Sequence, residues 1–135
     1  MEPRLIARAA ALGLASTALL TAVVFAWVLA YAYVVAPGHA PGLYQAYAAR
    51  VAPIAGIVLG MPVFAIAGHL VARRHAYAVP LILTPAATFI LIDLVLLAAF
   101  QRAAFTAWPL LLLSWLSKLI AAWAGGSFGS RRTPA

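Results

Sequence analysis

The chain has 135 residues, of which 67% are hydrophobic and only 8% are charged, and its mean hydropathy is +1.05. A soluble domain of this length needs a polar surface larger than its core, and so few charged residues cannot supply one. The composition therefore excludes an ordinary soluble domain and predicts an integral membrane protein. The sequence contains no cysteine, which excludes disulfides, thiolate metal sites and cysteine nucleophiles.

The net charge of +7 would suggest a nucleic-acid partner in a soluble protein. Here the basic residues lie between or beside apolar segments, and no basic patch is interleaved with exposed aromatic residues. We interpret these residues as determinants of membrane topology, and we expect no nucleic-acid partner.

Four apolar segments are long enough to cross a bilayer, which takes about 20 mainly apolar residues per helix. In chain order they cover residues 9–36, 51–72, 77–100 and 108–128. Short connections separate them, so we expect consecutive helices to be antiparallel neighbours. The predicted fold class is an all-α integral membrane protein, a four-transmembrane-helix antiparallel bundle, with residues 1–135 as a single transmembrane domain.

The first segment follows Arg4 and Arg8 and contains Ala30-Tyr31-Ala32, a pattern also found in secretory signals with a cleavage site. The hydrophobic region of a signal peptide spans about 7 to 15 residues, and this apolar segment is far longer. We therefore predict that it is retained as a transmembrane helix. In the connection that follows, residues 44–50 lack Gly and Pro, and they could form a helical turn at the membrane interface.

The second segment has a small residue at every fourth position, at Ala52, Gly56 and Gly60. This spacing allows two helix backbones to approach closely, and it serves equally for a contact within the chain or between copies. Pro62 lies near the middle of this segment, and we expect the helix to kink there.

The third segment contains Pro85 at a comparable depth, which predicts a second kink. Paired interruptions near the middle of the membrane can mark a transport site, because freed backbone carbonyls can line a cavity. Proline is also tolerated in membrane helices without any such role. The two interpretations of Pro62 and Pro85 stay open.

The fourth segment carries Lys118, with Ser114 one turn outward on the same face. Ser114 could hydrogen-bond a charged neighbour or a water, or only a carbonyl of its own preceding turn. Gly125 and Gly126 lie toward the inner end of this segment, and we expect them to be helix-packing residues, like those of the second segment.

Asp93 and Lys118 are the two ionisable residues well inside the apolar segments, apart from His69 near an inner end. A charge near the bilayer centre costs about 2.5 to 3.5 kcal/mol on insertion scales. The depths of Asp93 and Lys118 differ by about 5 Å at 1.5 Å of rise per residue, a distance that a lysine side chain can cover. We therefore predict an intramembrane ion pair, either structural or part of a proton or ion pathway.

The orientation follows from the arginines, because basic residues are retained on the cytoplasmic side. Most of those near the segment ends fall on one face: Arg4, Arg8, Arg73, Arg74, Arg131 and Arg132. Only Arg50 and Arg102 fall on the other face. The sequence thus predicts an N-in/C-in protein of the bacterial inner membrane, with both termini in the cytoplasm.

No catalytic, metal or cofactor site is expected, because the sequence has no Gly-x-Ser-x-Gly motif, no phosphate-binding glycine loop and no paired carboxylates. His39, His69 and His75 lack the carboxylate or thiolate neighbours of a metal site and the matched depths of a haem site. The chain is therefore not expected to be an enzyme.

These observations favour a small polytopic inner-membrane protein with a structural or accessory role, which packs through Gly/Ala helix faces in a homo-oligomer or a larger membrane complex. The expected partners are the lipid bilayer and either a second copy or another membrane protein. The alternative is a small transporter or channel that uses Asp93 and Lys118. A water-filled route to Asp93 would favour transport, whereas closed surroundings would favour the accessory role.

Overall fold

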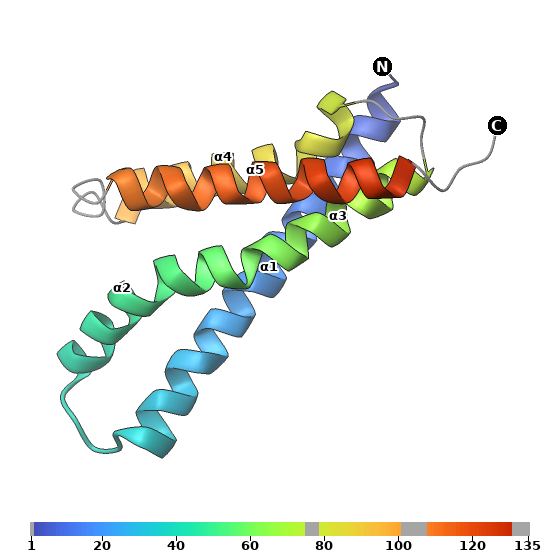
Figure 1. Cartoon of the computed structure of the whole chain (residues 1–135). Coiled ribbons are helices and arrows are strands. Elements are labelled where there is room, and N and C mark those ends of the chain that lie inside the picture. The colour runs from blue at the N-terminus through green and yellow to red at the C-terminus, as the bar shows by residue number, and fades with distance from the viewer. Residues whose placement is uncertain (1, 75–78, 101–107, 131–135) are drawn as a thin grey trace.

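A computed structural model describes residues 2–74, 79–100 and 108–130, and all of its regular secondary structure is helical. The elements, shown in Figure 1, are α1 (Pro3–Ala30), the π-helical turn η1 (Tyr31–Val35), α2 (Pro41–Val58), α3 (Gly60–Arg74), α4 (Val79–Phe100) and α5 (Trp108–Ser130). The predicted start of the third segment at residue 77 lies outside the described residues, and so do His75, Arg102, Arg131 and Arg132.

Within the described ranges, four helical stretches are long and apolar enough to cross a membrane. They cover Pro3–Val35, Pro41–Arg73, Val79–Ala99 and Trp108–Gly129. The predictions of an all-helical chain and of four candidate spans are therefore confirmed.

The first two spans are longer than predicted. They begin at Pro3 and Pro41 rather than at residues 9 and 51, and each contains 33 residues. Proline suits the first turn of a helix because its missing N–H has no partner there, and the few polar residues nearby are compatible with a helix. At 1.5 Å per residue each span is about 50 Å long, which exceeds the roughly 30 Å of hydrocarbon in a bilayer.

The second span is interrupted at Leu59, close to the predicted kink. Pro62 has no N–H to donate to the carbonyl of Val58, which is the last residue of α2. The next bond, from the Val63 amide to the Leu59 carbonyl, is long at 3.5 Å. By contrast, α4 stays helical through Pro85, which is fully buried.

The backbones of α3 and α5 touch. A Cβ atom on Gly68 would fall on the carbonyl oxygen of Ala122 and 2.8 Å from its carbonyl carbon. A Cβ atom on Gly125 would likewise fall on the backbone of Ala65. Further along, Gly129 meets the backbone of His69, so the contacts advance in the same direction along both helices, which run parallel (Figure 1).

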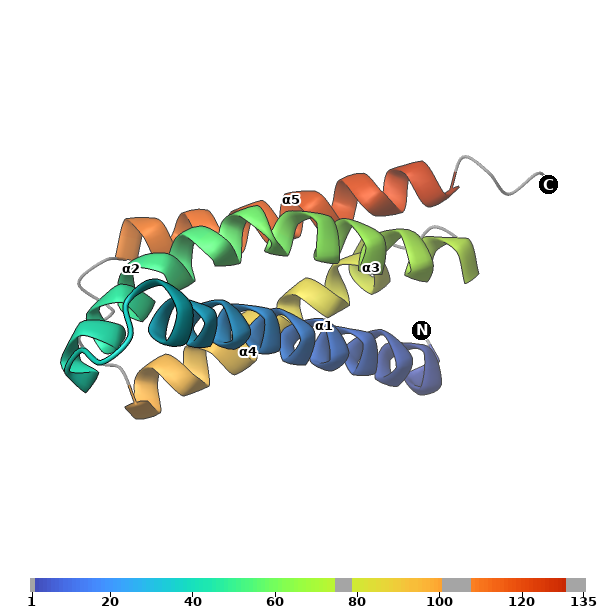
Figure 2. The same cartoon turned by 90° about the horizontal axis from the view of Figure 1, so that it is seen from below.

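A second close contact joins α1 and α4. A Cβ atom on Gly13 would lie 2.7 Å from the carbonyl oxygen of Pro85 and 2.9 Å from the Cβ of Thr88. Figure 2 accordingly shows two layers, with α2, α3 and α5 in one and α1 and α4 in the other. These contacts join the first span to the third and the second to the fourth, although short connections had led us to expect consecutive helices as the main neighbours. Glycine positions, rather than connection lengths, decide which backbones can touch.

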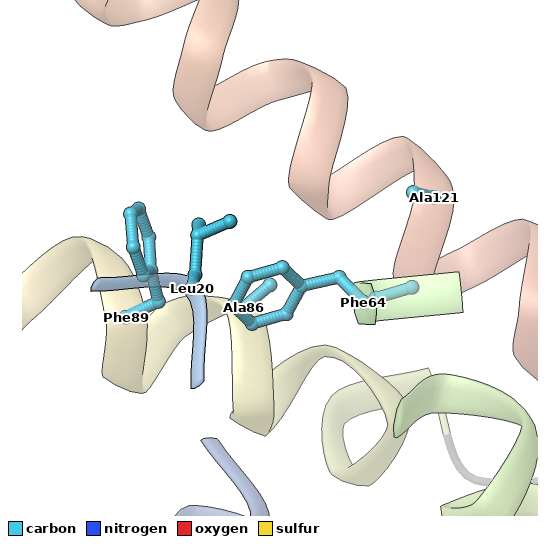
Figure 3. Close-up of a cluster of buried hydrophobic side chains, with 6 residues drawn as sticks. Leu20, Phe64, Ala86, Phe89 and Ala121 are labelled. Carbon is cyan, nitrogen blue, oxygen red and sulfur yellow. The ribbon is translucent and has the colours of Figure 1, made fainter. Parts of the chain in front are cut away.

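The core between the layers is a cluster of apolar side chains from four helices. Its buried members are Leu20, Phe64, Ala86, Phe89, Ala121 and Ala122. Figure 3 shows Phe64 beside Ala86 and Phe89, and the rings of Phe64 and Phe89 meet edge to face with centroids 5.3 Å apart. Nearer the termini of the chain, a second cluster contains Ala9, Val71, Ala72, Leu81 and Ile82.

Burial is concentrated in one half of the molecule, and Leu97 of α4 is the buried residue that lies furthest toward the other end among those described. The last buried residue of α1 is Leu20, and α2 has none. In α5 the buried residues begin only at Ser114. Figure 1 shows the α1–α2 hairpin diverging from α4 and α5 toward its tip. The bundle therefore has a closed end, near Ala9 and Ala72, and an open end, near Tyr31 and Trp108.

Aromatic side chains hold the tip of the α1–α2 hairpin together. The indole Nε1 of Trp27 donates to the Tyr47 hydroxyl at 3.0 Å, and the ring of Tyr31 stacks on that of Tyr47 at 3.6 Å. The Tyr44 hydroxyl donates to the carbonyl of Ala36 at 2.8 Å. Trp and Tyr with one polar and one apolar side are typical of membrane interfaces.

The contact of α3 with α5 predicts that even one methyl group is not tolerated at Gly68. We expect Gly68→Ala to lower the free energy of unfolding in detergent by about 1 to 3 kcal/mol, the usual range for overpacking, measured by thermal unfolding. Gly42→Ala is the matched control, because a Cβ atom there meets nothing within 4 Å. Equal effects of the two substitutions would contradict the described packing.

Candidate functional site

Lys118 lies in the middle of α5 and is fully buried, with 0% of its surface exposed. Two glycines of the second span leave room for it. A Cβ atom on Gly60 would lie 2.9 Å from the lysine Cε, and one on Gly56 would lie 3.8 Å from Nζ. The small-residue stripe predicted as a backbone contact therefore accommodates a side chain at these two positions, while Ala52, one turn further, is exposed.

The ammonium group of Lys118 has partners from two helices. Its Nζ donates to the Ser114 hydroxyl at 2.7 Å and to the Ser114 carbonyl at 3.1 Å. The same nitrogen lies 4.6 Å from the centre of the Phe89 ring on α4. A desolvated cation over an aromatic face is stabilised by about 2 kcal/mol or more. Of the two interpretations of Ser114, the structure shows the one in which its hydroxyl contacts a charge.

Asp93 lies on α4, is only partly buried, and also has an aromatic partner. Its Oδ2 accepts a hydrogen bond of 2.8 Å from the indole Nε1 of Trp115 on α5. The structure gives Asp93 and Lys118 these separate partners and no direct ion pair between them. The two side chains that we predicted to pair thus contact different residues.

Each of the two helices supplies an aromatic side chain that contacts the charged side chain of the other. On α4, Phe89 and Asp93 are four residues apart and share a face. On α5, Trp115 and Lys118 are three residues apart and also share a face. The aromatic ring of each helix contacts the charge of the other. We call these four residues, together with Ser114, the α4–α5 charge cluster.

The α4–α5 charge cluster fixes two charges without exposing Lys118. Within residues 2–74, 79–100 and 108–130, every buried side-chain nitrogen or oxygen has a hydrogen-bond partner. A buried polar group without a partner costs about 1 to 3 kcal/mol, and a charged group more. The cluster can therefore hold a lysine inside the bundle and bind the two helices together.

The remaining predicted packing residues lie at helix contacts. Gly125 faces the Ala65 backbone, and a Cβ atom on Gly126 would lie 2.5 Å from the side chain of Ile82. Pro85 faces Gly13 on α1. Pro62 follows the break in the second span and is exposed.

Sequence reasoning missed Gly68, Phe89 and Trp115. Gly68 continues the four-residue spacing of Gly56 and Gly60, with Phe64 in between, so extending that stripe would have found it. Phe89 and Trp115 lie one helical turn from the charges of their own helices, but this spacing alone did not show that each ring would face the opposite helix.

Neither of the two described histidines belongs to the charge cluster. His39 lies at the hairpin tip, with Nδ1 3.3 Å from the Ala36 carbonyl, and His69 lies toward the closed end beside Gly129. In the described part of the chain, no three His, Asp or Glu side chains gather where they could hold a metal ion.

Comparison with protein-family models, with curated proteins and with solved structures finds no match to this chain.

The contacts of Lys118 predict a specific dependence on Ser114. We expect Ser114→Ala to lower the free energy of unfolding in detergent by about 1.5 to 3 kcal/mol, because a buried charge loses a hydrogen-bond acceptor. The double substitution Ser114→Ala with Lys118→Met should recover most of this loss, because the charge that needed the acceptor is gone.

Thr84→Ala is a suitable control, since its hydroxyl only donates to the Pro80 carbonyl of its own helix at 2.9 Å. Thermal unfolding of the parent protein, of Ser114→Ala, of Lys118→Met and of the double variant gives the coupling between Ser114 and Lys118. Losses that simply add in the double variant would show that the two side chains do not depend on each other.

Proposed function

We propose that this chain is a small accessory or structural subunit of the membrane, which binds through its spans to another membrane protein or to a second copy. The observation that carries the proposal is that Lys118 is buried and already has partners within the chain. Its ammonium group is fully buried and already engaged by Ser114 and Phe89. Transport of an ion or solute through this point would require a charge that can exchange partners, whereas a fixed charge supports a structural role.

The glycine contacts also bear on where a partner would bind. Gly13, Gly68 and Gly125 are occupied by other helices of the same chain, so these faces are not available to a partner. The apolar surface at the open end is available. Its large exposed side chains include Phe25, Trp27, Val34, Leu91, Val95 and Leu113. A binding surface at the open end is therefore part of the proposal.

We further propose that consecutive spans are antiparallel and that the closed end faces the cytoplasm of a bacterial cell. The arginine distribution supports this orientation. Arg4, Arg8 and Arg73 are all exposed at the closed end, where headgroups and water can solvate them. Arg50 is exposed in the half of the second span, Pro41–Arg73, that lies nearer the tip.

A small transporter or channel is the second candidate. Two observations favour it: the second span is interrupted at Leu59, next to Gly60 and the Lys118 side chain, and Asp93 is only partly buried. Broken helices and intramembrane carboxylates both occur in transport pathways. Proton or solute flux in liposomes that is lost in Asp93→Asn would support this candidate over the accessory role.

The accessory role predicts a stable complex. In a mild detergent, the native protein should run at a mass well above that of one 14.2 kDa chain in its micelle, together with a second membrane protein or further copies in fixed stoichiometry. Native mass spectrometry gives this mass directly. A monomer in several mild detergents and in nanodiscs, with no companion, would contradict the accessory role.

The orientation predicts the behaviour of reporter fusions. A fusion after Arg74 and one after Ala135 should be active with a cytoplasmic reporter and inactive with a periplasmic one, because both points follow spans that end on the basic side. A fusion after Gly38, in the connection between η1 and α2, is the opposite control. Periplasmic activity after Arg74 would refute the N-in/C-in arrangement.

A further inference from the structure

Only one of the two carboxylate oxygens of Asp93 accepts a hydrogen bond from a described residue. The Trp115 indole occupies Oδ2, and among the described residues no hydrogen bond or ion pair involves Oδ1. No buried side-chain oxygen in the described ranges lacks a partner, so Oδ1 must reach the surface of the molecule. Trp115 thus holds one carboxylate oxygen and leaves the other accessible at the molecular surface.

The surroundings of Asp93 on its own helix are apolar. Leu91, Leu94 and Val95 are exposed on either side of it, and Asp93 lies seven residues from the end of α4 at Phe100. At 1.5 Å per residue this is about 10 Å below the helix end. In hydrocarbon a carboxylate oxygen finds no water to accept from, so it requires a donor supplied by a protein.

We propose that Asp93 is a docking point for a Lys or Arg side chain on a transmembrane helix of a different membrane protein, seated against α4 and α5 at the open end. This inference rests on the proposed accessory function and identifies its partner by charge. An acidic and a basic side chain that meet inside a bilayer satisfy each other where neither can be solvated.

A second copy of this chain does not fit the site as well. Its only basic residue well inside a span is Lys118, which is fully buried and engaged. Of the other basic residues whose side chains the structure describes, Arg4, Arg8 and Arg73 are exposed at the closed end. Arg50 lies six residues, about 9 Å, outward of Gly56, which packs against Ser114 and so marks the depth of the charge cluster. A heterologous helix can carry a basic residue at the matching depth, and the α1–α2 hairpin diverges from α4 and α5 toward the open end (Figure 1).

The proposal can be tested by photocrosslinking in intact cells. A photoreactive p-benzoylphenylalanine at Leu96 would lie one turn outward of Asp93 at a position that is 50% exposed. The same group at Leu91, which is exposed on a different side of α4, is the matched control. We expect one heterologous product from Leu96, from a protein with Lys or Arg in the middle of a span, and none of it from Leu91.

Charge variants then decide whether Asp93 makes the contact. Asp93→Asn keeps a neutral acceptor for Trp115 and removes the negative charge, so thermal unfolding should shift modestly to lower temperature, whereas the crosslink should fall at least tenfold. Asp93→Lys combined with an acidic residue in place of the partner's basic residue should restore it. Failure of this exchange to restore the crosslink would overturn the proposal.

The other outcomes separate this inference from the function on which it rests. If the native complex and the crosslink persist in Asp93→Asn, the accessory role stands and the docking point is wrong. A product made only of two copies of this chain would refute a heterologous partner. If only lipid adducts form and the native protein is a monomer, both proposals fail.

Discussion

The contact between the backbones of α3 and α5 sets the arrangement of the rest of the bundle. In a bilayer, lipid tails are as apolar as leucine, so helices associate through close packing and hydrogen bonds rather than through a hydrophobic driving force. Gly68 against Ala122 and Gly125 against Ala65 provide such packing at two points on the same pair of helices. Two points fix both the rotation and the register of α5 relative to the second span.

That register determines where Lys118 lies. One to two turns before the backbone contact, α5 places the lysine opposite Gly60 and Gly56, where the absence of side chains leaves the space that its methylene groups fill. The ammonium group then extends back along its own helix to Ser114 and lies over Phe89. A single packing constraint thus explains why a charged side chain is fully buried without a carboxylate in direct contact.

The α4–α5 charge cluster links this layer to α4 and relates the fold to the proposed function. Because Phe89 engages Lys118 and Trp115 engages one oxygen of Asp93, the lysine is satisfied within the chain and the aspartate is not fully so. The closed end holds the glycine contacts and the second buried cluster, whereas large apolar side chains are exposed at both ends, for example Ile6 and Phe128 at the closed end and Phe25 and Leu113 at the open end. In the proposed function, the glycine contacts stabilise the fold and the open end, where Asp93 lies, meets the partner.

Hydropathy and length predicted four candidate spans, which the structure confirms, because both are properties of short segments. Side-chain size likewise identified Gly125 and Gly126 as packing residues, and charge within an apolar segment singled out Asp93 and Lys118. The first two spans begin earlier than predicted, at Pro3 and Pro41. A few polar residues interrupt the apolar pattern there, but they do not prevent the helix from continuing. The pairing of the second span with the fourth, the position of Lys118 against Gly56 and Gly60, and the contacts of Phe89 and Trp115 with the charges of the opposite helix became visible in the fold alone. The physical reason is that these outcomes depend on the relative rotation and register of separate helices, which many small packing terms across the whole bundle fix together.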